Sequence, residues 1–501
     1  MKNTSVKNKR HTYCNPLAIP DLPRGKDDWY PFERGMFSHE NKPESVTVPD
    51  YRTISDPTVY YYDNKWYLYP SYGMAWVTED FETWEHVRTE PYCPKYSPCI
   101  TRWNGRFLLT SWNCPLYVGD SPTGPFTEMG PFISRDGTPF VPCDPCLFTD
   151  DDGRIYMYAF RGVDIPGREG EFISTVVGYE LDRTNPVRVV NGPVTVIRQN
   201  THANWWERQG GYNQDEEFGW VEGPHLLKHN GRYYMIYASP DTCTPNYCMA
   251  VYYSDEGPLT GFVCQKKNPL TYRIEGLVKG AGHGCVEHGP GNTLWAFYTI
   301  PARSTHEYER RIGMDLVDVD ENGELFCPSG VTFTPQYIPS ADTKKGAGEN
   351  STHELPVNTR YIPTASSFVA GREPHFSSDE SPLTWWQPCD DDTEPTLTFG
   401  LKQGTYRVTA SRVWWKEQGL DYAAGIVPGP FRYIIEGYNG KEWYTLLDRS
   451  DLDTDLNIDY CDFDAGICKA VRIRIVGWPK GITPGIVDFT VFGRRYVEGA
   501  E

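Results

Sequence analysis

Short polar turns followed by alternating apolar residues recur along the first two thirds of the chain. Asn-Gly, Asp-Gly or a similar pair opens each copy, and aromatic and aliphatic residues follow with a period of two. Both residues of such a turn must tolerate positive φ, so the pattern predicts β-hairpins. The five copies are DNKWYLYPS at 63, NGRFLLTSW at 104, DGRIYMYAF at 152, NGRYYMIYAS at 230 and GNTLWAFYT at 291.

The recurrence of one hairpin unit, with no helical periodicity between the copies, indicates small antiparallel sheets repeated around an axis. We therefore expect an all-β chain in which residues 50–339 form a five-bladed β-propeller. Each hairpin should supply the inner strands of one four-stranded blade. Gly-Pro turns in SPTGPF at 121 and SDEGPLTGF at 254 mark the outer edges of two blades.

The alternation stops after Gln336, where SADTKKGAGENSTHELP has the composition of a surface linker. This stretch predicts a linker over residues 340–358. Alternating runs then resume in RYIIEGY, AVRIRIVGW and VDFTVFG without the propeller turn. They predict a separate β-sandwich of the jelly-roll, galactose-binding-like kind over residues 359–501. Residues 1–49 lack the repeat, and we expect them to be an N-terminal extension that packs on the propeller.

The charge of the chain argues against two classes of partner. The formal net charge is −19, and no basic cluster is longer than the one from Lys7 to Arg10. Nucleic acid and anionic membranes both require a positive face, so neither is expected as a partner. The 16 Trp and 34 Tyr residues suit flat platforms on which sugar rings stack. The charge therefore favours a neutral or small partner; the oligomeric state stays open.

The N-terminal sequence MKNTSVKNKRHTYCNPLAIP has no apolar stretch of the length that a secretory signal needs. No later stretch is long and apolar enough to span a membrane. The 14 cysteines show no Cys/His spacing of the zinc type, which favours a reduced chain over a disulfide scaffold. The expected location is therefore cytoplasmic, and an exported protein whose leader has been trimmed is the alternative.

Three acidic residues stand just upstream of the repeat turn in three different blades. They are Asp56 in ISDPTVYYY, Asp144 in PCDPCLFT and Glu222 in WVEGPHLLKH, each followed by Pro or Gly-Pro. The proline fixes where the inner strand begins, so the three side chains should converge on one mouth of the central channel from equivalent positions. Cleavage of a glycosidic bond requires such carboxyl groups, one protonated and one ionised.

These motifs resemble glycoside hydrolase family 43, the five-bladed propeller enzymes that act on arabinose, xylose and sometimes galactose linkages. The resemblance implies that Asp56 is the general base and Glu222 the general acid. It also implies that Asp144 raises the pKa of the acid and orients it, as a nearby like charge would. The family inverts anomeric configuration, which implies that the carboxyl groups of base and acid lie about 6.5–9.5 Å apart.

The segment AGHGCVEHGPGNTLWAFYTIPAR resembles a Gly-His-Gly element of the same family, whose histidine lies near the axis beside a calcium ion or a water cluster. The resemblance implies that His283 binds substrate or a largely water-coordinated Ca²⁺, and that no other cofactor is required. RRIGMDLVDVDENGEL resembles the last-blade strand whose arginine points at the substrate. Arg311 is preferred to Arg310 for this role, and Arg303 is a second candidate.

Aromatic residues after two inner hairpins are candidates for the sugar platform. They are Tyr72 and Trp76 in SYGMAWVT and Trp112 in LLTSWNCP, and their alternative role is packing between blades. The second blade has Tyr-Ser-Pro at 96 where the family usually has Trp-Ala-Pro, and the loop over residues 200–218 is unfamiliar. Substrate preference is what these departures affect.

The region from about 360 to 495 resembles discoidin domains and the related family 32 carbohydrate-binding modules. The resemblance is carried by TASS at 364, TWWQPCDDDTEPTLTFGL, YIIEGYNGKEWYTLLDRS and AVRIRIVGW. Trp385, Trp414, Trp415 and Trp478 are candidates for a second sugar platform. The sequence leaves two roles open for this sandwich, a lectin module and a brace for the propeller.

The resemblance implies an inverting, exo-acting glycoside hydrolase that removes terminal arabinofuranosyl or xylosyl residues from plant-type polysaccharide or oligosaccharide. Exo action is suggested by long loops over residues 160–175 and 199–219, which could wall off the channel. A β-galactosidase or galactofuranosidase of the same family is one alternative. A carbohydrate-binding propeller without catalytic activity is the other.

Overall fold

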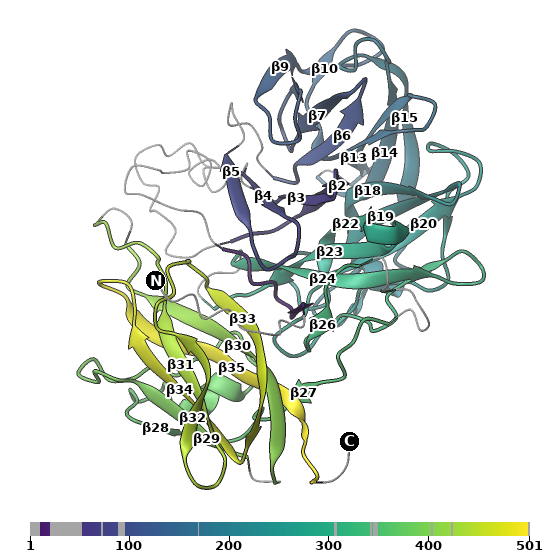
Figure 1. The fold of residues 1–501 in the computed structure, drawn as a ribbon. Coiled ribbons are helices and arrows are strands. Elements are labelled where there is room, and N and C mark those ends of the chain that lie inside the picture. The colour runs from purple at the N-terminus through teal and green to yellow at the C-terminus, as the bar shows by residue number, and fades with distance from the viewer. Residues whose placement is uncertain are drawn as a thin grey trace.

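The computed structural model describes residues 11–20, 53–71, 74–88, 96–168, 170–304, 308–340, 343, 349–401, 404–421 and 424–498. Two β-rich bodies make up this part of the chain (Figure 1). Strands coloured purple to teal form the upper body, and strands coloured green to yellow form the lower one.

The upper body is a propeller, and the described residues form five four-stranded antiparallel sheets in it. This confirms the all-β, five-bladed fold expected from the hairpin repeat. The blades, in chain order, are β2 (Thr58–Tyr62), β3 (Lys65–Tyr69), β4 (Met74–Thr78) and β5 (Glu85–Arg88); β6 (Cys99–Trp103), β7 (Arg106–Thr110), β8 (Leu116–Gly119) and β9 (Phe126–Gly130); β12 (Cys143–Thr149), β13 (Ile155–Asp164), β14 (Phe172–Leu181) and β15 (Val189–Arg198); β18 (Glu222–His229), β19 (Arg232–Ser239), β20 (Cys248–Ser254) and β21 (Val263–Cys264); β22 (Gly282–His288), β23 (Leu294–Pro301), β24 (Arg310–Val319) and β25 (Leu325–Phe326).

The predicted turns connect the first two strands of every blade. Asn104 and Gly105 have φ of 50° and 80°, and Asn230 and Gly231 have φ of 51° and 84°. Positive φ at both central residues gives the turn the twist of the flanking strands. The sequence signal therefore worked because Asn and Gly are the residues that tolerate this backbone.

Each pair of neighbouring blades encloses its own apolar core, and the fifth core joins the last blade to the first. Adjacent residues of one strand pack against the two different neighbouring blades. Leu226 packs toward blade 3 and Leu227 toward blade 5, for example. Both faces of a blade are thus buried, and each fully buried large side chain contributes about 1.5–3 kcal/mol. The ring is closed by packing of Trp66 in blade 1 with Phe297 in blade 5.

The N-terminal extension was expected to pack on the propeller. Of residues 1–49, only 11–20 are described; 1–10 and 21–49 lie outside the described residues. β1 (Thr12–Tyr13) pairs with β26 (Gln336–Tyr337), and the backbone N–H of Leu17 donates to the carbonyl of Ile312 in β24. This short segment therefore lies along the last blade.

The lower body is a β-sandwich of two antiparallel sheets within the described residues. Its apolar core lies between them and includes Trp386, Trp415 and Phe489. One sheet has the order β27 (Leu355–Pro356), β35 (Thr483–Arg495), β30 (Tyr406–Gln418) and β33 (Ile458–Cys468); the other has β28 (Thr364–Ala365), β29 (Thr396–Gly400), β34 (Ala470–Gly477), β31 (Arg432–Tyr438) and β32 (Trp443–Arg449).

Most of the tryptophans expected to form a sugar platform on the sandwich are covered. Trp415 stacks on Phe431 inside the core, and Trp414 packs against Leu277 and Ala302 of the propeller. The ring of Trp385 lies between the guanidinium of Arg372 at 3.4 Å and the ammonium of Lys416 at 4.8 Å. These contacts favour the role of a brace over that of a lectin module.

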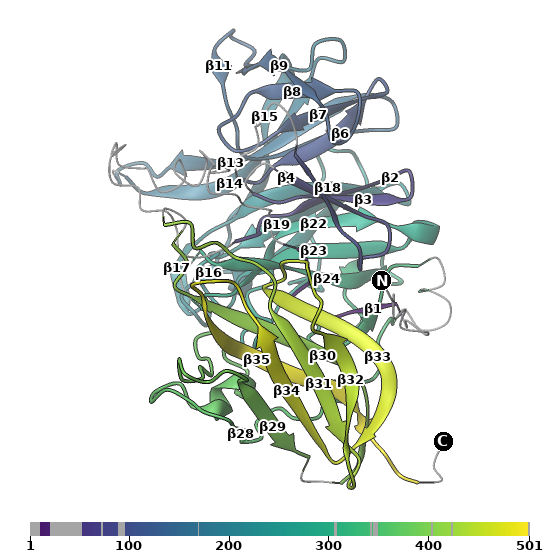
Figure 2. The ribbon, with the colours of Figure 1, turned by 60° about the vertical axis from the view of Figure 1, so that its left-hand side comes forward.

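Figure 2 shows that the sandwich lies beside the strands of the last blade. Small elements join the larger ones: β10 (Phe132–Ile133) with β11 (Pro139–Phe140), β16 (Arg208–Gln209) with β17 (Asp215–Gly219), and the 3₁₀ helices η1 (Trp205–Glu207), η2 (Pro290–Asn292) and η3 (Pro374–Ser378).

A search of the described residues finds no helix long and apolar enough to cross a membrane. Every cysteine in the described ranges is a free thiol.

Candidate active site

One residue at the start of each inner strand takes left-handed backbone. Non-glycine residues adopt this region rarely, at a cost of about 1–3 kcal/mol, and such residues cluster at functional sites. The five residues are Asp56 (φ 49°), Ser97 (φ 46°), Asp144 (φ 46°), Gly223 (φ 52°) and His283 (φ 39°). They define one end of the channel, which we call the acidic mouth after Asp56, Asp144 and Glu222.

The register of the blades corrects one expectation about the three acids. Glu222 pairs with Ala238 and His225 with Ile236, so one extra residue bulges between these pairs. The left-handed residue in the bulge of blade 4 is Gly223, whereas Asp144 has that place in blade 3. Glu222 therefore stands one position before the two aspartates instead of at an equivalent place.

The space beside Gly223 explains this offset. A Cβ added at Gly223 would lie 2.8 Å from the ring of His283, so no side chain fits there. A carboxyl group from blade 4 can then enter the acidic mouth only from the neighbouring residue, Glu222. The other four blades have side chains at this φ, so it is the close approach of His283 that requires glycine at position 223.

Asp56 is a buried carboxylate held by hydrogen bonds and one guanidinium. Arg310 Nη1 donates to its Oδ1 at 3.0 Å, and the hydroxyls of Ser71 and Ser55 donate to its Oδ2 at 2.6 and 3.0 Å. Burial by itself raises the pKa of Asp56, but Arg310, His283 and the two hydroxyls outweigh it. The net result is a pKa below the usual value of 3.8. Asp56 is therefore ionised near neutral pH.

His283 and Ser97 connect the two aspartates. Ser97 Oγ donates to Asp144 Oδ1 at 2.9 Å and lies 3.1 Å from His283 Nε2. Because the single hydroxyl proton goes to Asp144, His283 Nε2 must donate to Ser97 Oγ. The other ring nitrogen, Nδ1, lies 3.6 Å from Asp56 Oδ1. Burial raises the pKa of Asp144 above its usual value.

Glu222 has surroundings of a different kind. Tyr247 Oη donates to its Oε1 at 2.6 Å, and Trp220 Nε1 donates to its Oε2 at 2.8 Å. Burial, and after it the negative charge of Asp144, raises the pKa of Glu222 to about 7. The indole of Trp220 stacks on Phe160, with ring centroids 5.0 Å apart. Glu222 therefore keeps a proton up to about neutral pH.

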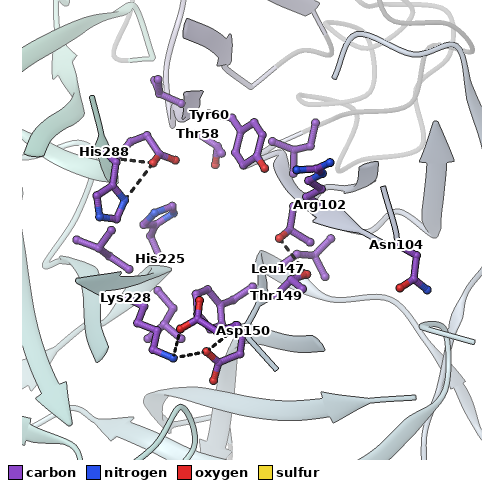
Figure 3. Close-up of a pocket in the computed structure, with 18 of the residues that line it drawn as sticks. Thr58, Tyr60, Arg102, Asn104, Leu147, Thr149, Asp150, His225, Lys228 and His288 are labelled. Atoms are coloured by element: carbon purple, nitrogen blue, oxygen red, sulfur yellow. Dashed lines mark hydrogen bonds and ion pairs between the residues drawn. The ribbon is translucent and has the colours of Figure 1, made fainter. Parts of the chain in front are cut away.

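Asp56, Asp144 and His283 line one narrow cavity together with Ser97 and Gly223. A second cavity, of about 690 Å³, lies toward the hairpin turns at the other end of the inner strands. Thr58, His225, Lys228 and Arg102 surround it (Figure 3). Three carboxyl groups line it: Asp150 and Asp151 pair with Lys228 at 2.5 and 2.8 Å, and Glu287 accepts from the backbone N–H of His288 at 2.6 Å.

The family model described as glycosyl hydrolases family 43 matches residues 41–325, more than half of the chain. The chain belongs to glycoside hydrolase family 43. Its propeller carries the match, in agreement with the resemblance read from the motifs.

Individual relatives match over shorter stretches. A xylosidase/arabinosidase of Butyrivibrio fibrisolvens is 28% identical over 153 residues, which cover 29% of this chain and 26% of the relative. A xylan 1,3-β-xylosidase of a Vibrio species is 31% identical over 208 residues, covering 38% and 33%. The chain thus spans about a quarter to a third of these two relatives. A solved thermostable family-43 glycoside hydrolase is 24% identical, with a TM-score of 0.47, covering 58% of this chain and 98% of that one.

The structure places Arg310, and not the preferred Arg311, at the acidic mouth. Arg310 reaches Asp56 and also donates to Thr242 at 3.1 Å. Arg311, the preferred residue, turns the other way and donates to Asn457 of the sandwich at 2.6 Å. Adjacent residues of a strand point to opposite faces, so only one of the pair can reach the acidic mouth. Arg303 follows β23, and among the described residues no hydrogen bond or ion pair joins its guanidinium to the acids.

The aromatic candidates have three different outcomes. Trp76 was expected to bind sugar, but it is 2% exposed and donates from Nε1 to the carbonyl of Pro20. It packs in the core between blades 1 and 5 because β4 turns this side chain inward. Tyr72 lies outside the described residues. Trp112 is half-buried beside Tyr96 and bonds the thiol of Cys143, next to Asp144, so it keeps its place as a candidate.

Calcium does not fit His283 as a direct ligand. Both ring nitrogens already face protein groups, Ser97 Oγ and Asp56 Oδ1. No three His, Cys, Asp or Glu side chains of the described ranges gather in a group that could hold a metal ion. Calcium prefers six to eight oxygen ligands, so an ion at this place would be coordinated largely by water, and that expectation for His283 stays a prediction.

Sequence reasoning missed most of the side chains that hold the acids, among them Ser55, Ser71, Ser97, Trp220 and Tyr247. It considered Arg310 but preferred Arg311. One signal was present: Ser97 precedes Pro98 as Asp56 precedes Pro57, at the same place before the repeat turn. Trp220 and Tyr247 lie in loops, where no periodicity points to them.

Proposed function

We propose that this family 43 protein is an inverting, exo-acting glycoside hydrolase that removes terminal arabinofuranosyl or xylosyl residues from plant-type polysaccharide or oligosaccharide. The observation that carries the proposal is the opposite shift of two carboxyl groups in one mouth. The pKa of Asp56 is lowered, and that of Glu222 is raised to about 7. One ionised and one protonated carboxyl group are what the reaction requires.

In the proposed mechanism Asp56 accepts a proton from a water molecule as that water attacks the anomeric carbon. Glu222 donates its proton to the oxygen of the leaving group on the opposite side of the sugar. Asp144 acts on Glu222 through its charge, which disfavours the ionised form of Glu222 and keeps the proton available. Arg310 and Ser71 fix the Asp56 carboxylate so that its oxygens stay aimed at the water.

Exo action is supported by the two long loops beside Glu222. The loop over 160–175 is the extended end of β13 and β14, and the loop over 199–219 contains η1, β16 and β17. Ser174 joins them, because its carbonyl accepts from the N–H of Gln199 and its hydroxyl accepts from the N–H of Val221. Phe160 and Phe172 then pack on Trp220. We infer that the joined loops close the channel on the side of the acid.

The choice of arabinose or xylose is supported by the names of two relatives, a xylosidase/arabinosidase and a xylan 1,3-β-xylosidase. A panel of 4-nitrophenyl α-L-arabinofuranoside, β-D-xyloside, β-D-galactopyranoside and β-D-galactofuranoside separates these sugars. Wild type, Asp56→Asn and Glu222→Gln are assayed side by side, and ¹H NMR records the anomer that forms first.

The proposal expects cleavage of the arabinofuranoside or the xyloside, loss of turnover in both variants, and a first product of inverted configuration. Cleavage of a galactoside alone would change the proposed substrate to a galactoside and leave the proposed mechanism intact. Binding of sugars without cleavage would favour a carbohydrate-binding propeller and overturn the proposal. A product of retained configuration would overturn the assignment of Asp56 as base.

A further inference from the structure

Strand β24 connects the acidic mouth to the sandwich through two adjacent residues. Arg310 turns toward the axis of the propeller and Arg311 turns toward the other body. Both are almost fully buried, with exposed fractions of 2% and 6%. Each buried guanidinium group requires firm partners, because a buried charge that loses its partner is strongly destabilising.

The carbonyl oxygen of Arg310 is hydrogen-bonded both to the segment before Asp56 and to Arg311. It accepts a hydrogen bond from the N–H of Ile54 at 3.0 Å and one from Arg311 Nη1 at 2.8 Å. Ile54 lies two residues before Asp56, so this carbonyl anchors the segment that carries the proposed base. The side chain of Arg310 holds the Asp56 carboxylate directly. Arg310 thus fixes Asp56 through both its backbone and its side chain.

Arg311 in turn is held from the sandwich. Its Nη2 donates to Asn457 Oδ1 at 2.6 Å, and Glu309 Oε1 lies 3.5 Å away. Asn457 stands just before β33, and its Nδ2 donates to the carbonyl of Trp415 at 3.0 Å. The N–H of Trp415 donates back to the carbonyl of Asn457 at 2.9 Å. This reciprocal pairing fixes Asn457 to the rigid core of the sandwich.

We propose that Asn457 is a positioning residue for the proposed base: through Arg311 and the carbonyl of Arg310, the sandwich sets where Arg310 and Asp56 lie. The inference rests on the function proposed above. It gives the sandwich a role inside the active-site scaffold, in addition to its packing against the propeller. A small displacement of a reacting group is enough to matter, because a shift of about 1 Å can cost on the order of 10²-fold in rate.

The test compares Asn457→Ala with Tyr460→Phe. Tyr460 Oη and Thr12 Oγ1 lie 2.7 Å apart across the same pair of bodies, so Tyr460→Phe removes a contact that does not lead to Asp56. In Asn457→Ala we expect kcat/KM to fall about tenfold or more, mainly through kcat. The acid limb of its pH profile should move to higher pH, because Arg310 then stabilises the Asp56 carboxylate less. Tyr460→Phe should keep the wild-type profile.

Asn457→Asp keeps an acceptor oxygen for Arg311 but loses the donor to the carbonyl of Trp415, so we expect it to restore part of the activity and to move the acid limb less than Asn457→Ala does. Thermal melting of all variants separates misfolding from misplacement. An Asn457→Ala profile equal to that of Tyr460→Phe would overturn the inference while leaving the proposed function intact. If wild type cleaves no glycoside, the proposed function fails, and crystal structures decide the inference instead. A distance between Arg310 and Asp56 that is unchanged in Asn457→Ala would then contradict it, and a lengthened one would support it.

Discussion

Asp56 and Glu222 lie in surroundings that shift the pKa of a carboxyl group in opposite directions. Asp56 meets a guanidinium and two serine hydroxyls, all of which stabilise its ionised form. Glu222 meets an indole N–H and a phenol, and the charge of Asp144 acts against its ionisation. Asp56 is buried and Glu222 is half-buried. The comparison shows that burial alone does not assign acid and base; the partners at each site do.

The largest expected effect comes from removing either carboxyl group. Asp56→Asn and Glu222→Gln should each lower kcat/KM by about 10²–10⁴-fold or more, because general acid or base catalysis contributes about that much. Glu222→Gln should lose less on an aryl glycoside than on a natural linkage, since a good leaving group needs no proton. Steady-state assays on both kinds of substrate measure this.

Asp150→Asn is the matched control, because Asp150 lies in the cavity toward the hairpin turns and is held by Lys228 and Tyr233. It should leave kcat/KM unchanged. An equal loss in Glu222→Gln for both kinds of leaving group would contradict the role of Glu222 as the acid.

Arg310→Met tests whether Arg310 lowers the pKa of the proposed base, Asp56. Without the guanidinium, the pKa of Asp56 rises, so the acid limb of kcat/KM should move up by about 1–3 pH units. Breaking this buried pair should also cost about 3–5 kcal/mol in the free energy of unfolding, measured with urea. Arg310→Lys keeps the charge and should show a smaller change in both. An acid limb that stays in place in Arg310→Met would mean that Arg310 does not set the pKa of Asp56.

Asp144→Asn tests whether Asp144 raises the pKa of the proposed acid, Glu222. Removing the negative charge favours the ionised form of Glu222, so its pKa falls from about 7. Because Glu222 works only when protonated, the alkaline limb of kcat/KM should move to lower pH by about one unit. The pH profile of the variant against that of wild type gives the shift. Movement of this limb to higher pH would contradict the proposed action of Asp144.

Tyr247→Phe should give the smallest effect, with the opposite sign. The Tyr247 hydroxyl donates to Glu222 Oε1 and stabilises its ionised form. Its loss should raise the pKa of Glu222 and move the alkaline limb up by about half a unit to one unit, in line with the net value of a hydrogen bond. The same pH profiles measure it. A downward shift equal to that of Asp144→Asn would show that the two contacts do not oppose each other.

The fold was predictable because its signals are local. Asn104-Gly105 and Asn230-Gly231 must form tight hairpins wherever they lie, and five copies of such a turn leave few architectures. Asp56 and Asp144 were found for the same reason, since each precedes a proline at the start of an inner strand.

What the sequence could not supply depends on register and on contacts between distant segments. Arg310 and Arg311 are neighbours in a strand, and only the pairing of β24 decides which one faces the axis. The offset of Glu222 follows from the glycine in the bulge at position 223, because His283, sixty residues later, fills the space that a side chain there would need. Trp76 and Trp414 are buried by the N-terminal segment and by the other body, and neither contact has a local signal.

The most direct test is a titration of Glu222 and Asp56 in the free protein by ¹³C-carboxyl NMR. Differences from Glu222→Gln and Asp56→Asn assign the two signals. We expect Glu222 to titrate near 7 and Asp56 to titrate below its usual 3.8. Titration of Glu222 near its usual 4.5, or of Asp56 above 3.8, would contradict the assignment of acid and base.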